Sequence, residues 1–180
     1  DTGPGNTLMD AWARRHLDMP FDQDGRWAAS GSIDTPFLER LLTDPYFRRP
    51  PPKSLDVRSF DLAWLEAYSG GPQRPADMQA TLLALTATSL VTAIDEWGGN
   101  PEDVVVTGGG ALNTELRRAI AARLAPRPLL AGDSDGIPAT LVEAIGFAWL
   151  GRATLREDRL DLGRITGARR PVILGGVYPA

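Results

Sequence analysis

The sequence predicts an α/β domain, and three observations support this fold class. The chain has 180 residues, close to the usual length of one domain, and 43% of them are apolar, which is enough to form a core. Strand-like and helix-like segments alternate from residue 104 to residue 150, as they do in α/β proteins. Glycine- and proline-rich turns separate helical segments earlier in the chain. We therefore expect one domain in which helices flank a sheet.

The first part of the chain is predicted to contain short helices and long connections. A helix should follow Asn6, because apolar residues recur after it at nearly helical spacing and its side chain can cap the first N–H groups. A second, short helix is predicted over 35–42. Residues 20–31 have the composition of a loop. The prolines of 48–54 predict an extended connector, because they lack N–H donors.

The longest helix is predicted over residues 76–97. Leucine, valine and isoleucine occupy much of its circumference, which is typical of a helix that is buried on most sides. Breaker residues over 70–75 precede it, and Gly98–Pro101 ends it. We expect this helix to form the centre of the core.

After that helix, strands and helices are predicted to alternate. Val104–Thr107 is β-branched throughout, as in a central parallel strand that is covered on both faces. Three glycines follow it directly, and a helix begins at Asn113 and Thr114. The remaining predicted elements are a strand over 128–131, a loop over 133–138 and a helix over 141–150.

The three glycines, Gly108, Gly109 and Gly110, are the strongest local signal for a ligand site. Without Cβ atoms they let a ligand approach the backbone, and the N-terminus of the next helix favours a phosphate or a polar nucleoside. The segment matches neither the dinucleotide fingerprint nor the Lys-containing phosphate loop. Nucleotide binding and a tight turn without a ligand both remain open.

Two carboxylates are candidates for chemistry. Asp1 begins a glycine-rich turn, where it could accept a proton from water or, alternatively, cap backbone groups. Glu143 is the only charged residue in the apolar segment Leu141–Trp149, so it is paired, hydrogen-bonded or directed to solvent. His16 and Lys53 are expected to have ordinary surface roles.

Composition excludes several classes of protein. The net charge of −4 is not that of a nucleic-acid-binding protein. The absence of cysteine excludes disulfides and thiol nucleophiles, and the single histidine argues against a histidine metal site. No apolar run reaches the ~18 residues of a membrane span. Because the chain begins with Asp1 inside a turn, we expect it to be the C-terminal part of a longer protein, or else a processed chain.

Six motifs, in order along the whole chain, resemble the anhydro-N-acetylmuramic acid kinase family. They are Asp1–Asn6 with Asp10–Trp12, Asp44–Phe47, Pro50–Ser54, Gly108–Asn113, Glu143–Ala148 and Leu174–Pro179. The family belongs to the actin-like, sugar-kinase and heat-shock ATPase superfamily. The resemblance implies a ribonuclease H-like (actin-like ATPase) second lobe with a mixed sheet flanked by helices. Residues 1–180 would be the C-terminal lobe of a two-lobe kinase, without the N-terminal lobe and the first strands of this lobe.

The resemblance also implies an activity and roles for individual residues. Such kinases open the 1,6-anhydro ring of anhydro-N-acetylmuramic acid with water and phosphorylate its 6-oxygen from ATP, in the recycling of peptidoglycan. Asp1 matches the catalytic base, and Glu143 matches an acidic position near the active site. Gly108, Gly109, Gly110 and Asn113 match the nucleotide-binding motif, while Gly3 and Asn6 are the candidate sugar-binding residues. ATP and Mg²⁺ are the expected cofactors, with unknown metal ligands.

Further expectations follow from the resemblance. The protein should be cytoplasmic, should bind neither nucleic acid nor membrane, and should form a homodimer at full length. The sequence has no Gly-Thr-Ser-type phosphate-binding motif and has Thr140 where members often have an acidic residue, so we expect the chain alone to be inactive. Asp1 and the triple glycine should face one shared hollow. The alternatives are a non-catalytic nucleotide- or sugar-binding module, another carbohydrate kinase of the superfamily, or a fragment without a separate function.

Overall fold

A computed structural model describes residues 1–56, 58–71, 73–132 and 136–178. The elements in chain order are α1 (Thr7–Leu17), the 3₁₀ helix η1 (Gln23–Gly25), α2 (Arg26–Ala29), α3 (Thr35–Leu41), α4 (Pro45–Arg48), α5 (Leu62–Tyr68), α6 (Pro75–Trp97), β1 (Val104–Val106), the 3₁₀ helix η2 (Gly109–Leu112), α7 (Thr114–Leu124), β2 (Leu129–Ala131), the 3₁₀ helix η4 (Ala139–Leu141), α8 (Val142–Leu155) and α9 (Gly163–Thr166). The α/β class is as predicted, and the predicted elements occur in the expected order. The helices α4, α5 and α9 were not predicted from the sequence. Pro72, Asp133 and Pro179, which fall in predicted turns or motifs, lie outside the described residues.

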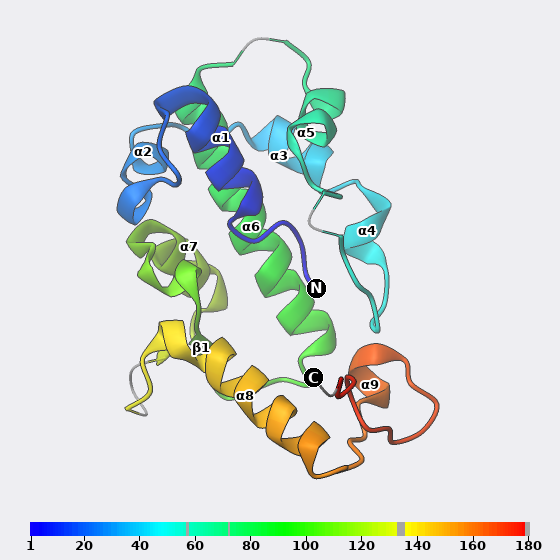
Figure 1. The fold of residues 1–180 in the computed structure, drawn as a ribbon. Helices are drawn as coiled ribbons and strands as arrows, with labels where there is room; N and C mark the ends of the chain where they lie inside the picture. The colour runs from blue at the N-terminus through cyan, green and yellow to red at the C-terminus, as the bar shows by residue number, and fades with distance from the viewer. Residues whose placement is uncertain (57, 72, 133–135, 179–180) are drawn as a thin grey trace.

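The long helix α6 is the centre of the structure. It runs through the middle of the molecule, with α1, α2, α3 and α7 packed around it (Figure 1). Thirteen of its 23 residues are buried, as the sequence predicted. The segment that contains Gly31 lies very close to the start of α6, because glycine has no side chain. A Cβ placed on Gly31 would lie only 2.0 Å from the carbonyl oxygen of Ala76.

The length and composition of α6 are also those of a membrane-spanning helix. However, 67% of the most apolar 18-residue window of α6 is buried inside the protein. The apolar side chains of α6 therefore already pack against the other helices, as in the core helix of a globular domain.

The sheet is smaller and more exposed than predicted. β1 and β2 form a two-stranded parallel sheet in which Val104, Val105 and Val106 pair with Leu129, Leu130 and Ala131. Among the described residues, one further bridge outside the named strands is antiparallel and joins Leu160 to Val172. Val105 is 45% exposed, so the expectation of a strand covered on both faces is wrong for the described chain. The predicted mixed sheet is likewise not seen in this part of the protein.

Residues 23–29 form the helical turns η1 and α2, so the predicted loop over residues 20–31 is wrong for this part of the segment. Both carboxylate oxygens of Asp22 are used here, because they accept hydrogen bonds from the N–H groups of Trp27 and Ala28, each at 2.9 Å. Asp22 is buried, and it also accepts a bond from the Gln79 side chain of α6. A carboxylate at the beginning of a helix satisfies N–H groups that have no partner within the helix. The composition of residues 20–31, which is that of a loop, does not show that Asp22 stabilises helical turns in this way.

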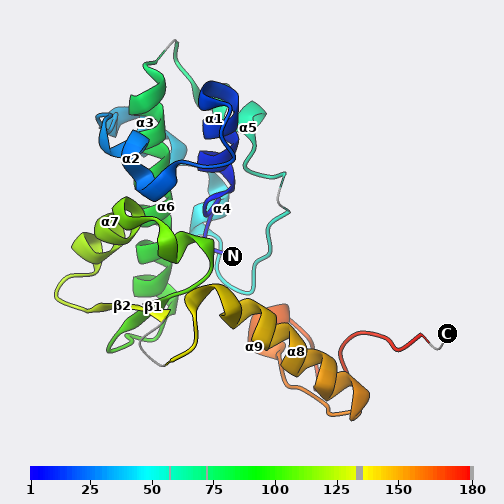
Figure 2. The ribbon, with the colours of Figure 1, turned by 60° about the vertical axis from the view of Figure 1, so that its left-hand side comes forward.

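The C-terminal part of the chain extends away from the helical body. Figure 2 shows α8 extending away from the region of β1 and from the helical body. α8 is longer than predicted, since it continues to Leu155. The C-terminal end of α8 is held by a hydrogen bond of 2.6 Å from the Thr154 hydroxyl to the carbonyl oxygen of Leu174.

We expect Leu85→Ala to destabilise the protein by about 2–5 kcal/mol, because Leu85 is completely buried in α6 and its removal leaves a cavity. Urea unfolding followed by circular dichroism measures this change. Leu17→Ala, at a leucine that is 40% exposed, is the matched control and should cost less than about 1 kcal/mol. Equal losses for the two variants would contradict the central role of α6.

Candidate functional site

The segment of residues 1–6 lies across α6 and is held by close contacts. The Thr86 hydroxyl donates a hydrogen bond of 2.7 Å to the carbonyl oxygen of Gly5. A Cβ placed on Gly3 would lie 2.7 Å from the Ser89 hydroxyl oxygen and 3.1 Å from the Phe47 ring. Gly3, a predicted sugar-binding residue, therefore has a packing function: only a residue without a side chain lets the segment lie this close to the helix.

The side chain of Asn6 lies beside the three glycines, Gly108–Gly110. A Cβ placed on Gly110 would lie 3.5 Å from the amide nitrogen of Asn6 and 3.7 Å from its amide oxygen. Asn6 precedes α1, but it has helical backbone angles and makes no capping hydrogen bond with its side chain. The predicted side-chain cap is therefore wrong, and the Asn6 amide lies instead beside the glycines.

The backbone of the glycine segment is shaped by one unusual residue. Gly108 has φ +73° and ψ −166°, a conformation that is essentially restricted to glycine. Its N–H donates to the carbonyl oxygen of Ala139 at 2.9 Å, and the chain then forms η2. Asn113 ends this turn and caps α7, because its side-chain oxygen accepts a hydrogen bond of 3.0 Å from the N–H of Leu116.

A hollow of about 230 Å³ lies between Asn6 and this segment. It is lined by Asn6, Asp10, Phe21, Asp22, Gln23, Asp24, Gly109, Leu112 and Asn113. Three predicted site residues, Asn6, Gly109 and Asn113, thus face one space. The large apolar side chains of Phe21 and Leu112 are both exposed, so they offer apolar surface to a flat group, while the surrounding amides and carboxylates can hydrogen-bond to hydroxyls. This arrangement is suited to a small polar ligand such as a nucleoside.

The titratable group in this hollow with a shifted pKa is Asp10. Burial raises the pKa of its carboxyl group above the ordinary value of 3.8; the nearby Arg14 opposes this effect and Asp22 adds to it. In the sequence, Asp10 is marked only by its place in the motif Asp10–Trp12. Its nearness to Asp22 could not be foreseen, since it depends on how residues 20–25 fold back against α1.

Asp1 lies in a different hollow from the glycines. One of its carboxylate oxygens accepts a hydrogen bond of 2.8 Å from the N–H of Leu55, and the Tyr46 hydroxyl donates one of 2.9 Å to its carbonyl oxygen. This second hollow, of about 390 Å³, is also lined by Lys53, Trp97 and Arg164. The expectation of one shared hollow is therefore not met in the described chain. The segment 1–6 nevertheless connects the two spaces, because Asp1 stands at one end and Asn6 at the other.

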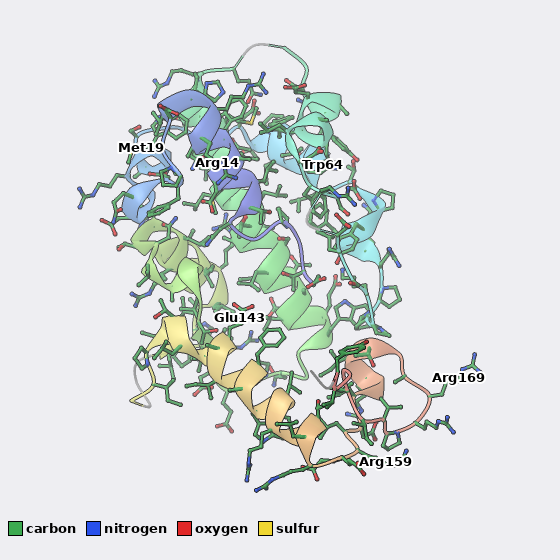
Figure 3. All side chains as sticks on the ribbon, viewed as in Figure 1. Arg14, Met19, Trp64, Glu143, Arg159 and Arg169 are labelled. Atoms are coloured by element: carbon green, nitrogen blue, oxygen red, sulfur yellow. The ribbon has the colours of Figure 1, made fainter. Side chains whose placement is uncertain are left out.

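Glu143 lies apart from both hollows. It is exposed in the first turn of α8, on the side of the helix that faces α6 and α7 (Figure 3). It lines neither the glycine hollow nor the Asp1 hollow. Among the residues that the structure describes, no group of three His, Cys, Asp or Glu side chains could hold a metal ion.

Gly25 allows η1 to pack closely against Asn113 and the first turn of α7. It has a left-handed φ of +71°, and a Cβ on it would lie 2.5 Å from the side-chain oxygen of Asn113 and 2.7 Å from Cβ of Glu115. No sequence motif marks this residue, because the contact joins segments about 90 residues apart in the chain.

We expect Gly25→Ala to destabilise the protein more than Gly99→Ala does. Both glycines have left-handed φ angles, so each substitution costs about 1–2 kcal/mol of backbone strain. A Cβ on Gly99 meets open space, whereas one on Gly25 collides with the Asn113 cap. Urea unfolding compares the two variants, and equal destabilisation would show that the contact with Asn113 has no energetic importance.

Asp10→Asn should make the protein more stable at neutral pH. Because the native pKa of Asp10 is raised, wild-type stability falls as the pH rises from about 3.8 through the native pKa, and the variant lacks this loss. Thermal unfolding across this range should show equal stability at the acid end and a growing advantage for the variant above it. The exposed Asp103→Asn is the control, and a difference that does not change with pH would contradict burial as the cause.

Comparison with known proteins gives one consistent result. The family described as Anhydro-N-acetylmuramic acid kinase matches residues 1–180. Curated proteins named anhydro-N-acetylmuramic acid kinase are 45% identical in Bordetella petrii over 185 residues, 42% in Nitrosospira multiformis over 180 and 45% in Chromobacterium violaceum over 182. These matches cover 99–100% of this chain and 49–50% of each relative, so the chain spans about half the length of the curated relatives. By the family match over its whole length, the chain belongs to the anhydro-N-acetylmuramic acid kinase family.

Proposed function

We propose that residues 1–180 are the C-terminal lobe of an ATP-dependent kinase of peptidoglycan recycling. The protein opens the ring of 1,6-anhydro-N-acetylmuramic acid with water and phosphorylates its 6-oxygen, giving N-acetylmuramic acid 6-phosphate. The family match over the whole chain carries this proposal. The segment of residues 1–6 gives structural support, because it joins a carboxylate at Asp1 to the glycine segment at Asn6.

Asp1 is the general base in this proposal. It takes a proton from water, the water oxygen bonds to the anomeric carbon, and the bond from that carbon to the 6-oxygen breaks. The 6-oxygen takes the γ-phosphoryl group of ATP, and ADP leaves. The hydrogen bond from the N–H of Leu55 to one carboxylate oxygen supports this role, because it fixes the orientation of the carboxylate group. The transferred phosphoryl group captures the leaving oxygen, so that oxygen needs no separate proton donor.

The hollow at the triple glycine is the proposed nucleoside site. Gly108, Gly109 and Gly110 let the nucleotide approach the backbone, and Asn113 holds the turn in position. Mg²⁺ would come bound to the phosphates of ATP, since it usually keeps several waters and takes few ligands from the protein. Gly3 and Asn6, the predicted sugar-binding residues, lie in the segment that connects the two hollows, and Asn6 also borders the nucleoside site. Glu143 is a second carboxylate whose role depends on the rest of the protein.

The proposed protein is larger than this chain. An N-terminal lobe would supply the phosphate-binding segment that residues 1–180 do not contain, and further strands would complete a ribonuclease H-like sheet beside β1 and β2. A cytoplasmic homodimer belongs to the same proposal. The alternative of a non-catalytic nucleotide- or sugar-binding module is favoured by the separation of Asp1 from the glycine hollow.

Asp1→Asn in the full-length protein should abolish turnover and leave ATP binding nearly unchanged. The loss should be about 10²–10⁴-fold in kcat, the usual contribution of a general base. A coupled ADP-release assay measures turnover, and calorimetric titration measures nucleotide binding. Asp103→Asn, an exposed carboxylate outside both hollows, should retain full activity.

Two results would contradict this proposal. Equal loss of turnover and of nucleotide binding in Asp1→Asn would show that Asp1 is structural. Binding of ADP by the unsubstituted full-length protein, without phosphoryl transfer to any amino sugar, would favour the binding module. A panel of carbohydrate substrates separates the proposed activity from that of another sugar kinase.

A further inference from the structure

The N-terminal half of α8, with the residue before it, is apolar and exposed on all sides. Nine consecutive residues, Leu141–Trp149, are exposed, and Glu143 is the only charged residue among them. The large exposed side chains are Leu141, Val142, Ile145, Phe147 and Trp149. Figure 2 shows this helix extending away from the body that α1–α7 form. Helices of this composition are normally buried in a core, because water solvates their side chains poorly.

Two opposite faces of α8 need to be covered. Phe147 is 66% exposed and Trp149 is 52% exposed. Residues two positions apart in an α-helix lie about 160° apart around its axis, so these two side chains point in nearly opposite directions. A cover that removes both from water must contact the helix on at least two sides.

The small sheet beside this helix also exposes apolar surface that needs to be covered. β1 and β2 form two parallel strands, and Val105 is 45% exposed. Parallel sheets normally have more strands and are covered on both faces. Exposed apolar side chains of β1 and of α8 therefore indicate a cover of considerable size.

The size of this cover indicates that it is formed by another part of the same chain and not by a second copy of the protein. A two-fold symmetric contact uses one patch on each subunit, so it would cover one face of α8 and leave the opposite face in water. The curated relatives are about twice as long as this chain, so they contain a further segment of comparable length. A segment of that size can surround a helix and also extend the adjacent sheet.

We propose that α8 is enclosed on both faces by the half of the full-length chain that residues 1–180 do not include. The Phe147 and Trp149 faces are both intramolecular contacts. Glu143 lies one helical turn before Phe147, on the same side of the helix. The segment that covers Phe147 therefore also borders Glu143 and removes part of the solvent around its carboxylate.

Cysteine labelling of the full-length protein tests this proposal. Residues 1–180 contain no cysteine, so single substitutions Phe147→Cys and Trp149→Cys can be made in a protein in which any other cysteines are replaced. Glu39→Cys, at an exposed position of α3, is the accessible control. We expect both α8 thiols to react with a maleimide at least ~10-fold more slowly than the control, since a covered thiol reacts only when the cover opens.

The dependence on protein concentration identifies what covers the helix. Slow labelling that is the same at nanomolar and micromolar protein supports the proposal. Labelling of either thiol at the rate of the Glu39→Cys control would overturn it, and so would protection that is lost on dilution, which identifies a second copy. If a substitution prevents folding, amide exchange over 142–155 in the unsubstituted protein decides: rates as slow as those of α6 support enclosure, and rates of an open peptide exclude it. Neither measurement depends on turnover, so failure here would not affect the proposed kinase activity.

Discussion

The candidate site depends on how closely other parts of the chain can approach α6. The segment of residues 1–6 reaches its position only because Gly3 has no side chain at the level of Ser89 and because Thr86 holds the carbonyl group of Gly5. Asn6 then meets Gly110, and the hollow forms between them. The glycine hollow therefore depends on the contacts of one segment with one buried helix, and not on the glycine motif alone.

Local sequence patterns predicted the elements that frame the site. The apolar circumference of α6, the β-branched run of β1 and the start of α7 after Asn113 are all found where expected. Each of these features is determined by neighbouring residues: periodic burial, strand preference or a side chain that bonds to the next turn. The same patterns revealed the triple glycine and the exposed carboxylate of Asp1, because both stand in short turns that glycine makes recognisable.

Contacts between distant segments could not be predicted in this way. Residues 20–31 look like a loop, yet residues 23–29 form helical turns in which Asp22 accepts hydrogen bonds from the N–H groups of Trp27 and Ala28. Gly25 packs on Asn113 across about 90 residues of sequence. Asp1 and the glycines were expected in one hollow, but Leu55 and Tyr46 hold Asp1 in a separate one. In each case the result depends on tertiary packing, which a pattern of residue types does not contain.

The pairing of Gly3 with Ser89 also limits how this protein can be engineered. A larger residue at either position would fill the same narrow gap, so the two sites cannot be varied independently in a mutant library. Any pair of replacements that fits must keep their combined volume small, or the backbone of residues 1–6 moves outward and carries the Asp1 carboxylate with it. Substitutions meant to change the lining of either hollow are therefore best made at other residues, with this glycine–serine contact left as it is.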